Sequence, residues 1–334
     1  MSKAFIKALE SYLPEGVLTN EELVREFPEW TVEKIAAKVG VESRHIAASD
    51  ETACDMGLQA AERLFEQNSE ISKDEIDYVL FCTQSPDYFL PTSACIIQNK
   101  LGLRTDIGAL DFNLGCSGYV YGLSLAKGLI VSGIAENVLL ITAETYSKFL
   151  HPRDKGNRTI FGDGATASLI SIDGFAEIGN FALGTDGRGA ENLIVKRGGC
   201  RFPRQTGEVR FDENGNPLSE DYLYMNGSEI FTFTQRNVPK VISEVLQKNG
   251  LSLDKVDLFV FHQANSYMLE FLRKKLKIQE EKYVVCMSET GNTVSNSIPL
   301  ALIKSKEDSR FEGNVCICGF GVGYSWGACV LKAN

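Results

Sequence analysis

The sequence lacks an excess of basic residues, a membrane-spanning apolar run and a signal peptide. The 334 residues carry 34 Lys and Arg against 44 Asp and Glu, which gives a net charge of −10. A nucleic-acid-binding protein would show a basic face, so we expect no nucleic-acid partner. No apolar run approaches the length of a membrane span, and residues 1–6 lack the layout of a signal peptide. We therefore expect no membrane partner either.

The cysteines lack the patterns of disulfides and metal sites. There are nine of them, an odd number, and no C-x-x-C motif occurs, which argues against a disulfide framework and against a zinc site. Cys316 and Cys318 share a strand face without a second pair, so we interpret them as two buried thiols. Free thiols are typical of a reducing compartment, and we expect a cytoplasmic protein without a bound metal.

What the sequence does contain is an alternation of helices and apolar strands, which predicts an α/β fold. Asn20 is expected to cap a first helix, and Trp30 to start a second one that ends near Val39. Further helices are expected at 52–66, 92–101, 118–131 and from about 266. Strands are expected at 5–9, 78–82, 137–142, 161–171, 258–261 and in a run that ends at 331.

Three patterns occur twice, in the same order and roughly half a chain apart. They are Asp-x-x-Asp before an apolar strand, Asn-Val before an apolar run, and Phe-Gly-x-Gly before a strand. The pairs begin at 74 and 254, 137 and 314, and 161 and 320. We infer an internal duplication of one α/β unit, with halves at 1–172 and 173–334. Residues 173–225 have no clear counterpart, and we expect surface loops or an irregular insertion there.

A cysteine stands between glycines where a short apolar strand runs into a helix. Gly115 and Gly118 allow a tight turn that presents Cys116 at its apex. The unpaired N–H groups and the macrodipole of a helix N-terminus favour thiolate over thiol. Cys116 is therefore a candidate nucleophile, although a small buried hydrophobe is the alternative. The helix that follows is small or apolar on several faces, so we expect it to be buried.

Two further polar residues could complete a catalytic site. His262, one of only three histidines, directly follows the strand 258–261, and α/β sheets place their chemistry at the carboxyl ends of strands. Asn292 lies in a Gly-Asn pair, which could equally be a simple turn. The glycines of 319–323 suggest a nucleotide-binding loop only superficially, because no helix and no acidic residue follow in the required places.

Taken together, these motifs resemble the 3-oxoacyl-[acyl-carrier-protein] synthase III family, and the similarity runs essentially from end to end. The motifs that carry the resemblance are Tyr12-Leu13-Pro14, Arg44 to Ala47, Gly115 to Gly118, Ile160 to Ala165, His262 to Asn265, Gly291 to Thr293, and Gly319 to Gly327. The resemblance implies a duplicated thiolase-like fold with layered mixed sheets and buried central helices. It also implies a catalytic triad of Cys116, His262 and Asn292.

The implied reaction is a decarboxylative Claisen condensation that starts fatty acid synthesis. Cys116 would take an acyl group from acyl-CoA. His262 and Asn292 would donate hydrogen bonds to the enolate oxygen formed from malonyl-[acyl-carrier-protein]. Backbone N–H groups of Cys116 and Val322 would hold the oxyanion of the acyl intermediate. The family often has three glycines where this chain has Gly321-Val322-Gly323, and a valine could narrow the site. Coenzyme A thioester is a substrate here, and no metal or redox cofactor is required.

The resemblance also assigns binding residues and a homodimer. The coenzyme A and carrier-binding residues would be Trp30, Lys155, Asn265, Tyr267, Arg273, Lys274 and Lys275. Lys155 and Tyr267 stand where the family usually has arginines. The last three are a basic cluster just after His262, which could steer an acidic carrier protein. Leu90, on the loop 86–91, stands where a larger aromatic often closes the partner subunit's acyl pocket.

Four other functions compete with this interpretation. Related 3-hydroxy-3-methylglutaryl-CoA synthases need a carboxylate where this chain has Gln84, which cannot transfer protons in that way. Plant-type polyketide synthases share the triad but differ in the glycine loop. A starter-unit ketosynthase or acyltransferase of a specialised lipid or polyketide pathway is the main alternative. A non-catalytic partner subunit is disfavoured by the intact triad.

Overall fold

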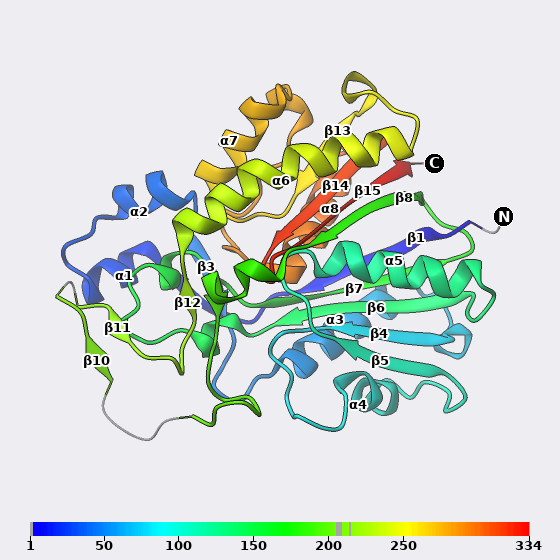
Figure 1. Ribbon diagram of the computed structural model, residues 1–334. Coiled ribbons are helices and arrows are strands. Elements are labelled where there is room, and N and C mark those ends of the chain that lie inside the picture. Colours follow the sequence, from blue (N-terminus) through cyan, green and yellow to red (C-terminus); the bar gives the residue numbers. More distant parts are fainter. Residues whose placement is uncertain (1–2, 205–208, 214, 334) are drawn as a thin grey trace.

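The computed structural model describes residues 3–204, 209–213 and 215–333, and nine of its strands form one mixed sheet (Figure 1). The strands of this sheet are β1 (Phe5–Tyr12), β4 (Tyr78–Cys82), β5 (Gly108–Phe112), β6 (Asn137–Glu144), β7 (Gly164–Ser171), β8 (Ala176–Thr185), β13 (Leu258–Phe261), β14 (Asn314–Gly321) and β15 (Ser325–Ala333). Three two-stranded sheets pair β2 (Gly16–Thr19) with β3 (Ser43–Ile46), β9 (Leu193–Ile194) with β12 (Tyr224–Met225), and β10 (Arg210–Phe211) with β11 (Pro217–Leu218).

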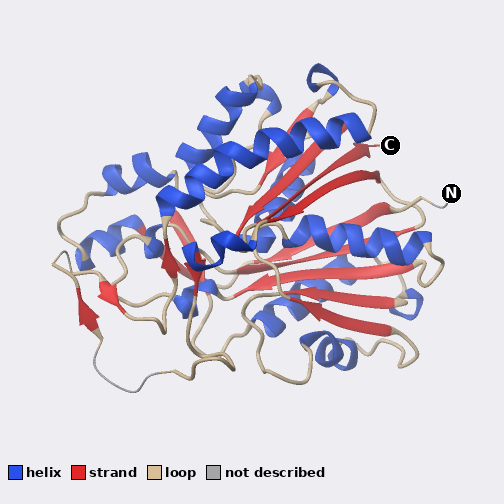
Figure 2. Ribbon diagram, in the orientation of Figure 1, coloured by secondary structure: helices blue, strands red, loops and turns tan. Residues whose placement is uncertain are grey.

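Helices cover the outer faces of the sheet, and two further helices lie between its two halves (Figure 2). They are α1 (Asn20–Glu26), α2 (Val32–Val39), α3 (Ala53–Gln67), α4 (Ser93–Lys100), α5 (Gly118–Val131), α6 (Gly227–Lys248), α7 (Ser266–Leu276) and α8 (Ser297–Glu307). No helix among the described residues is long and apolar enough to cross a membrane.

The order of strands repeats on either side of the sheet's middle. From β1 outward the neighbours are β7, β6 and β4, and from β8 outward they are β15, β14 and β13. The pairs β4–β6 and β13–β14 are parallel, and the pairs β6–β7 and β14–β15 are antiparallel. Strands β1 and β8 join the two series. The duplicated α/β fold expected from the sequence is therefore confirmed, whereas the boundary at 172/173, which falls between β7 and β8, stays a prediction.

Two helices lie between the two series of strands. Helix α5 contacts β4, β6 and β7 of the first series and β8, β14 and β15 of the second, while α8 contacts β1, β13 and β14. Gly122 explains the close approach of α5, because a Cβ there would lie 2.7 Å from Leu140. The sequence predicts a buried helix, but α5 is not buried on every side. Leu125 and Val131 are 41% and 42% exposed.

Two other expectations need correction. Residues 176–185 form the central strand β8 instead of a loop. Among the described residues of 186–225, the strands are each two residues long. Glycines and polar side chains interrupt the apolar pattern that would have predicted β8. Thr19, not Asn20, caps α1, since its side chain accepts from the N–H of Glu22, and the Glu22 carboxylate accepts from the N–H of Thr19. Asn20 is buried and donates to the carbonyl of Val41.

Candidate active site

Cys116 lies in the tight turn between β5 and α5 that the glycines predict. The N–H of Gly118 donates to the carbonyl of Gly115 at 2.7 Å, which closes the turn. Cys116 is 6% exposed. The end of β14 approaches it closely, because a Cβ at Gly321 would lie 2.9 Å from Sγ of Cys116. Only glycine at this position leaves the sulfur in place.

Backbone donors surround the sulfur as the resemblance implies. The N–H groups of Cys116 and Val322 both interact with the Cys116 thiol and stabilise its charged form. The side chain of Val322 points toward Gly115, where a Cβ would lie 2.8 Å from Cγ1 of the valine. Val322 is not among the residues that line the cavity, so its side chain does not narrow the site.

Burial works against the thiolate form of Cys116, which the helix N-terminus favours. Burial raises the pKa of the Cys116 thiol to about 12, and the charge of Glu144 adds to that rise. The two N–H groups oppose the rise but do not cancel it. Desolvation of the sulfur therefore opposes the field of the helix N-terminus and favours the thiol.

His262 follows β13 directly and is 2% exposed. Its Nδ1 lies 2.7 Å from Oγ of Ser297, a residue that sequence reasoning missed. Ser297 is the first residue of α8, and its Oγ also lies 3.0 Å from the carbonyl of Val294. Burial lowers the pKa of His262 to about 3, so the ring is neutral at physiological pH.

Asn292 is oriented by the turn that follows it. Its Oδ1 accepts from the N–H of Val294 at 2.9 Å, and its Nδ2 donates to the carbonyl of Ala264 at 3.5 Å. Val294 has a φ of 57°, in the left-handed region that β-branched residues rarely adopt. The N–H of Val294 thus fixes Asn292, while its carbonyl lies against Ser297 and His262.

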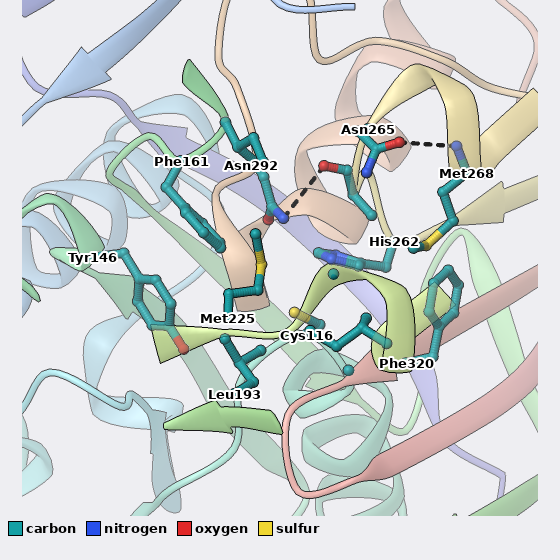
Figure 3. A pocket seen from close by; sticks show the side chains of 15 residues that line it. Cys116, Tyr146, Phe161, Leu193, Met225, His262, Asn265, Met268, Asn292 and Phe320 are labelled. Carbon is teal, nitrogen blue, oxygen red and sulfur yellow. Dashed lines mark hydrogen bonds between the residues drawn. The ribbon is translucent and has the colours of Figure 1, made fainter. Parts of the chain in front are cut away.

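The three predicted catalytic residues, from three separate segments, line one cavity of about 90 Å³ (Figure 3). Apart from polar groups at its centre, the lining is apolar. It includes Tyr146, Phe161, Leu193, Met225, Met268 and Phe320. An apolar cavity with a few convergent polar groups is the usual form of an active or ligand-binding site.

A buried acid that no sequence pattern had indicated lies behind the nucleophile. Glu144, at the end of β6, is 0% exposed. Its Oε2 accepts from the backbone N–H of Gln84 at 3.1 Å and from the hydroxyl of Ser85 at 3.4 Å, and its Oε1 accepts from Ser295 at 2.9 Å. Burial raises the pKa of Glu144 to about 8. Glu144 does not line the cavity.

Some of the predicted binding residues are brought together. Lys155 forms an ion pair with Glu29, the residue before Trp30. Lys34 and Lys38 lie 5.8 and 5.2 Å from the centre of the Trp30 ring. Asn265 lines the cavity and also caps α7, since its Oδ1 accepts from the N–H of Met268 at 2.9 Å.

The basic cluster on α7 is weaker than the sequence suggests. The Arg273 side chain is only 17% exposed, and its guanidinium is bonded to Glu270 at 2.7 Å. Lys274 is 70% exposed but pairs with the same carboxylate, and Lys275 donates to the carbonyl of Gln235. Tyr267 is 65% exposed and lies against Phe231. Arg273 therefore contributes little free charge to this surface.

The loop that carries Leu90 is exposed. Tyr88, Phe89 and Leu90 are 61%, 80% and 82% exposed. Leu90 does not line the cavity of its own chain. Three consecutive large apolar side chains in water are unusual for an isolated monomer, since such patches generally mark contact surfaces.

Known proteins resemble the chain over its whole length. Two models of 3-oxoacyl-[acyl-carrier-protein] synthase III match, over residues 110–187 and, for its C-terminal part, 246–333. A beta-ketoacyl-[acyl-carrier-protein] synthase III of Campylobacter concisus is 37% identical over 99% of this chain and 97% of its own length. A crystal structure of a 3-oxoacyl-(acyl-carrier-protein) synthase III, 48% identical, has a TM-score of 0.95 and covers 99% of both chains.

A more distant structure is the priming beta-ketosynthase of the R1128 polyketide pathway. It is 27% identical, with a TM-score of 0.83, over 99% of this chain and 97% of its own. The full-length relatives are closer to this chain than the polyketide enzyme is, and they carry one family name. The chain therefore belongs to the 3-oxoacyl-[acyl-carrier-protein] synthase III family.

Proposed function

We propose that the protein condenses an acyl group from acyl-CoA with malonyl-[acyl-carrier-protein], which yields a 3-oxoacyl-carrier protein and starts fatty acid synthesis. The observation that carries this proposal is the shared cavity of Cys116, His262 and Asn292. A nucleophile and two neutral hydrogen-bond donors around one apolar space suit a reaction that passes through an acyl-enzyme and an enolate.

In the first half-reaction Sγ of Cys116 attacks the thioester carbonyl of acyl-CoA. A bond forms between sulfur and the acyl carbon, the bond from that carbon to the sulfur of coenzyme A breaks, and the thiol proton leaves with the coenzyme A thiolate. The N–H groups of Cys116 and Val322 point at the sulfur and are placed to stabilise the oxyanion of this step. Because the resting thiol has a raised pKa, its proton must be lost as the thioester reacts.

In the second half-reaction the malonyl thioester loses CO₂, and the electron pair of the broken C–C bond becomes an enolate. Nδ1 of His262 pairs with Oγ of Ser297, and a neutral ring that carries its proton on Nε2 can donate it to the enolate oxygen. Asn292 offers its Nδ2 as a second donor. The enolate carbon then attacks the acyl carbon, and Cys116 leaves as the thiolate and regains a proton.

Coenzyme A and the carrier protein would meet neighbouring parts of the surface, because α2 contacts α7. Trp30 and Lys155, with Lys34 and Lys38, offer an aromatic ring and positive charges to the nucleotide end of coenzyme A. Lys274 and Lys275 are the lysines on α7 that could meet an acidic carrier protein, with Tyr267 beside them. The chemistry needs no redox cofactor and no metal.

We further propose a homodimer that works in the cytoplasm. The exposed loop with Phe89 and Leu90 would be covered by a second copy and would reach its acyl cavity. Strand β5 at the sheet edge, where Leu110 is 42% exposed, offers a second surface for the same contact. The free state of all nine cysteines favours a reducing compartment. Light scattering of the wild type and of Phe89→Asp/Leu90→Asp should give a dimer and a monomer, and a wild-type monomer at micromolar concentration would contradict this part.

The test of the activity is an intact mass spectrum of the protein after it is mixed with acyl-CoA. The wild type should gain the mass of one acyl group, and Cys116→Ala should gain none. The control variant Cys95→Ala/Cys200→Ala removes the two exposed thiols, which could react without catalysis, and should be acylated like the wild type. An adduct that persists on Cys116→Ala would show that another cysteine is the nucleophile.

The second candidate is a starter-unit ketosynthase of a specialised pathway, which the likeness to the R1128 enzyme favours. It would use the same site and differ in its acyl donor and carrier. Gln84 opposes a 3-hydroxy-3-methylglutaryl-CoA synthase, because its carboxamide bonds Tyr146 and Asn113 and cannot serve as an acid. Condensation assays with acetyl-CoA and with longer or branched donors separate the first two candidates.

A further inference from the structure

The buried Glu144 joins the segment that carries the nucleophile to the segment that carries the two donors. It is the last residue of β6, and its Oε1 accepts from the hydroxyl of Ser295, which lies 151 positions away in the sequence. Its Oε2 accepts from the backbone N–H of Gln84 and from the hydroxyl of Ser85. Glu144 and Ser295 are both buried, so these bonds lie in the interior, where a polar group that loses its partner is costly.

On one side, Glu144 is linked through Gln84 to the turn of Cys116. The Nε2 of Gln84 donates at 3.1 Å to Oδ1 of Asn113, which precedes Cys116 by three positions. The Oε1 of Gln84 accepts at 2.6 Å from the hydroxyl of Tyr146, which lines the cavity. Strands β5, β4 and β6 are parallel neighbours, so these groups follow the carboxyl ends of three adjacent strands. The nucleophile's turn and one wall of the cavity are therefore tied to Glu144.

On the other side, Ser295 directly follows Val294, whose backbone orients both donors. The N–H of Val294 donates to Oδ1 of Asn292 at 2.9 Å, and its carbonyl lies against His262. Ser295 also packs against the first turn of α5, since a Cβ at Gly118 would lie 3.4 Å from the Cβ of the serine. A displacement of Ser295 would therefore move Val294, and with it both donors, relative to the nucleophile.

We propose that Glu144 is a positioning residue of the condensation step, which keeps His262 and Asn292 aligned with the acyl group on Cys116. This inference rests on the proposed function. Glu144 does not line the cavity, so it acts through its hydrogen-bond partners. Condensation needs the enolate oxygen, both donors and the acyl carbon in one arrangement, and a misplacement of about 1 Å can cost about 10²-fold in rate. Acyl loading needs only the sulfur and the two N–H groups around it.

A carboxamide can replace the carboxyl of Glu144 without loss of these bonds. Burial raises the pKa of Glu144 to about 8, so the neutral acid, which a carboxamide resembles, predominates at pH 7. Oε2 faces a backbone N–H, which can only donate, whereas Oε1 faces a hydroxyl, which can donate and accept. Glu144→Gln can therefore accept from Gln84 with its oxygen and donate to Ser295 with its nitrogen, whereas Glu144→Ala deletes both links.

The experiment measures the two half-reactions separately, as acyl loading from acetyl-CoA by intact mass and as 3-oxoacyl product formed from malonyl-carrier protein. Glu144→Ala and Ser295→Ala should each lower the kcat of condensation by about tenfold or more, while loading stays within about threefold of the wild type. The KM for malonyl-carrier protein should not rise, because both side chains lie in the interior. Glu144→Gln should keep condensation within about threefold of the wild type.

The matched control is Ser171→Ala, which removes another buried serine hydroxyl. Ser171 donates to Asn137 at the opposite end of β6 from Glu144, and its replacement should leave both half-reactions unchanged. The double variant Glu144→Ala/Ser295→Ala should lose little more condensation than Glu144→Ala alone, because both substitutions remove the same link.

The outcomes separate this inference from the proposed function. If the wild type takes no acyl group or forms no 3-oxoacyl product, the proposed function fails. If the wild type does both, and Glu144→Ala and Ser295→Ala lower loading and condensation equally or lower neither, the inference alone is overturned. Fully additive losses in the double variant overturn it as well. Should Glu144→Ala fail to fold, Ser295→Ala and Glu144→Gln decide. An unchanged ratio of condensation to loading in Ser295→Ala, or an equal loss in Glu144→Gln, contradicts the role of Glu144.

Discussion

The hydroxyl of Ser297 lies 2.7 Å from Nδ1 of His262, and it is the ring's hydrogen-bonding neighbour on the side away from the cavity. A neutral imidazole donates from one nitrogen and accepts at the other, so the partner of Nδ1 decides which form Nε2 takes. Ser297 is thus a positioning residue for the proposed condensation, although it does not line the cavity.

Replacing Ser297 with Ala should lower condensation by about tenfold or more while leaving acylation of Cys116 largely intact. Without the hydroxyl, His262 loses the bond that fixes its tautomer. The matched control is Ser305→Ala, which deletes another buried hydroxyl of α8 that bonds only within the helix. Separate assays of the two half-reactions check this, and equal losses in Ser297→Ala and Ser305→Ala would point to helix stability instead.

Removing either cavity donor, His262 or Asn292, should lower condensation more than Ser297→Ala does, while acyl loading persists. In His262→Ala or Asn292→Ala, condensation should fall by about 10²-fold or more, the usual scale for a positioned oxyanion donor, because the enolate oxygen loses a partner. Acyl loading should persist, since the N–H groups of Cys116 and Val322 are untouched. Single-turnover loading and steady-state condensation measure the two effects, and a parallel loss of both would refute the division of labour.

The neutral state of His262 has a consequence for the pH profile. Its pKa is lowered by burial from 6.5 to about 3, so no proton is gained between pH 7 and pH 5. The condensation rate should therefore show no acid limb with a midpoint near pH 6.5. A rate profile measured with a donor that is saturating at each pH tests this, and a limb at 6.5 that disappears in His262→Gln would contradict it.

Glu144 should make stability fall as the pH rises. Its pKa is raised by burial from 4.5 in the unfolded chain to about 8, so the folded state binds the proton more tightly. This contribution is fully present below pH 4.5 and is lost progressively up to pH 8. Glu144→Gln cannot ionise, so the melting temperature of the wild type relative to this variant should drop between pH 5 and pH 8. A constant difference across this range would show that Glu144 is ionised throughout.

Charge reversal on α7 should weaken the use of carrier protein selectively. Lys274→Glu/Lys275→Glu should raise the KM for malonyl-carrier protein and reduce its dependence on salt, because steering by exposed charges is screened beyond ~8 Å at physiological ionic strength. Acylation by acyl-CoA should change little. Lys248→Glu is the matched control, since Lys248 also pairs with a glutamate four residues earlier, at the end of α6. Identical salt responses in all three proteins would reduce the two lysines to a solvated helix face.

The sequence predicted those parts of the site that depend on local chemistry. Cys116 was visible because a tight turn needs its glycines, and His262 because it directly follows an apolar strand. Ser297, Glu144 and Tyr146 were not visible, because their roles arise from contacts with residues 35 to 151 positions away. The raised pKa of the Cys116 thiol could not be predicted for a similar reason, since desolvation depends on how the whole cavity closes around the sulfur.

The same division holds for the fold. The repeated motifs revealed the duplication because they recur in order, but β8 escaped because Gly179 and Gly184 weaken its strand pattern. Both glycines are explained by close neighbours that only the folded chain supplies. A Cβ at Gly179 would meet the carbonyl of Val330 at 2.7 Å, and one at Gly184 would overlap with the Trp326 ring.

Val294 shows how narrowly some positions of this protein can vary. A left-handed backbone favours Gly, Asn or Asp, and it costs a β-branched residue about 1–3 kcal/mol. The fully buried side chain, however, needs an apolar residue of moderate size. Few amino acids meet both demands, so position 294 should tolerate almost no substitution although it lies outside the cavity lining. Positions near the cavity that tolerate few substitutions would then include residues that only position His262 and Asn292, as well as these two donors themselves.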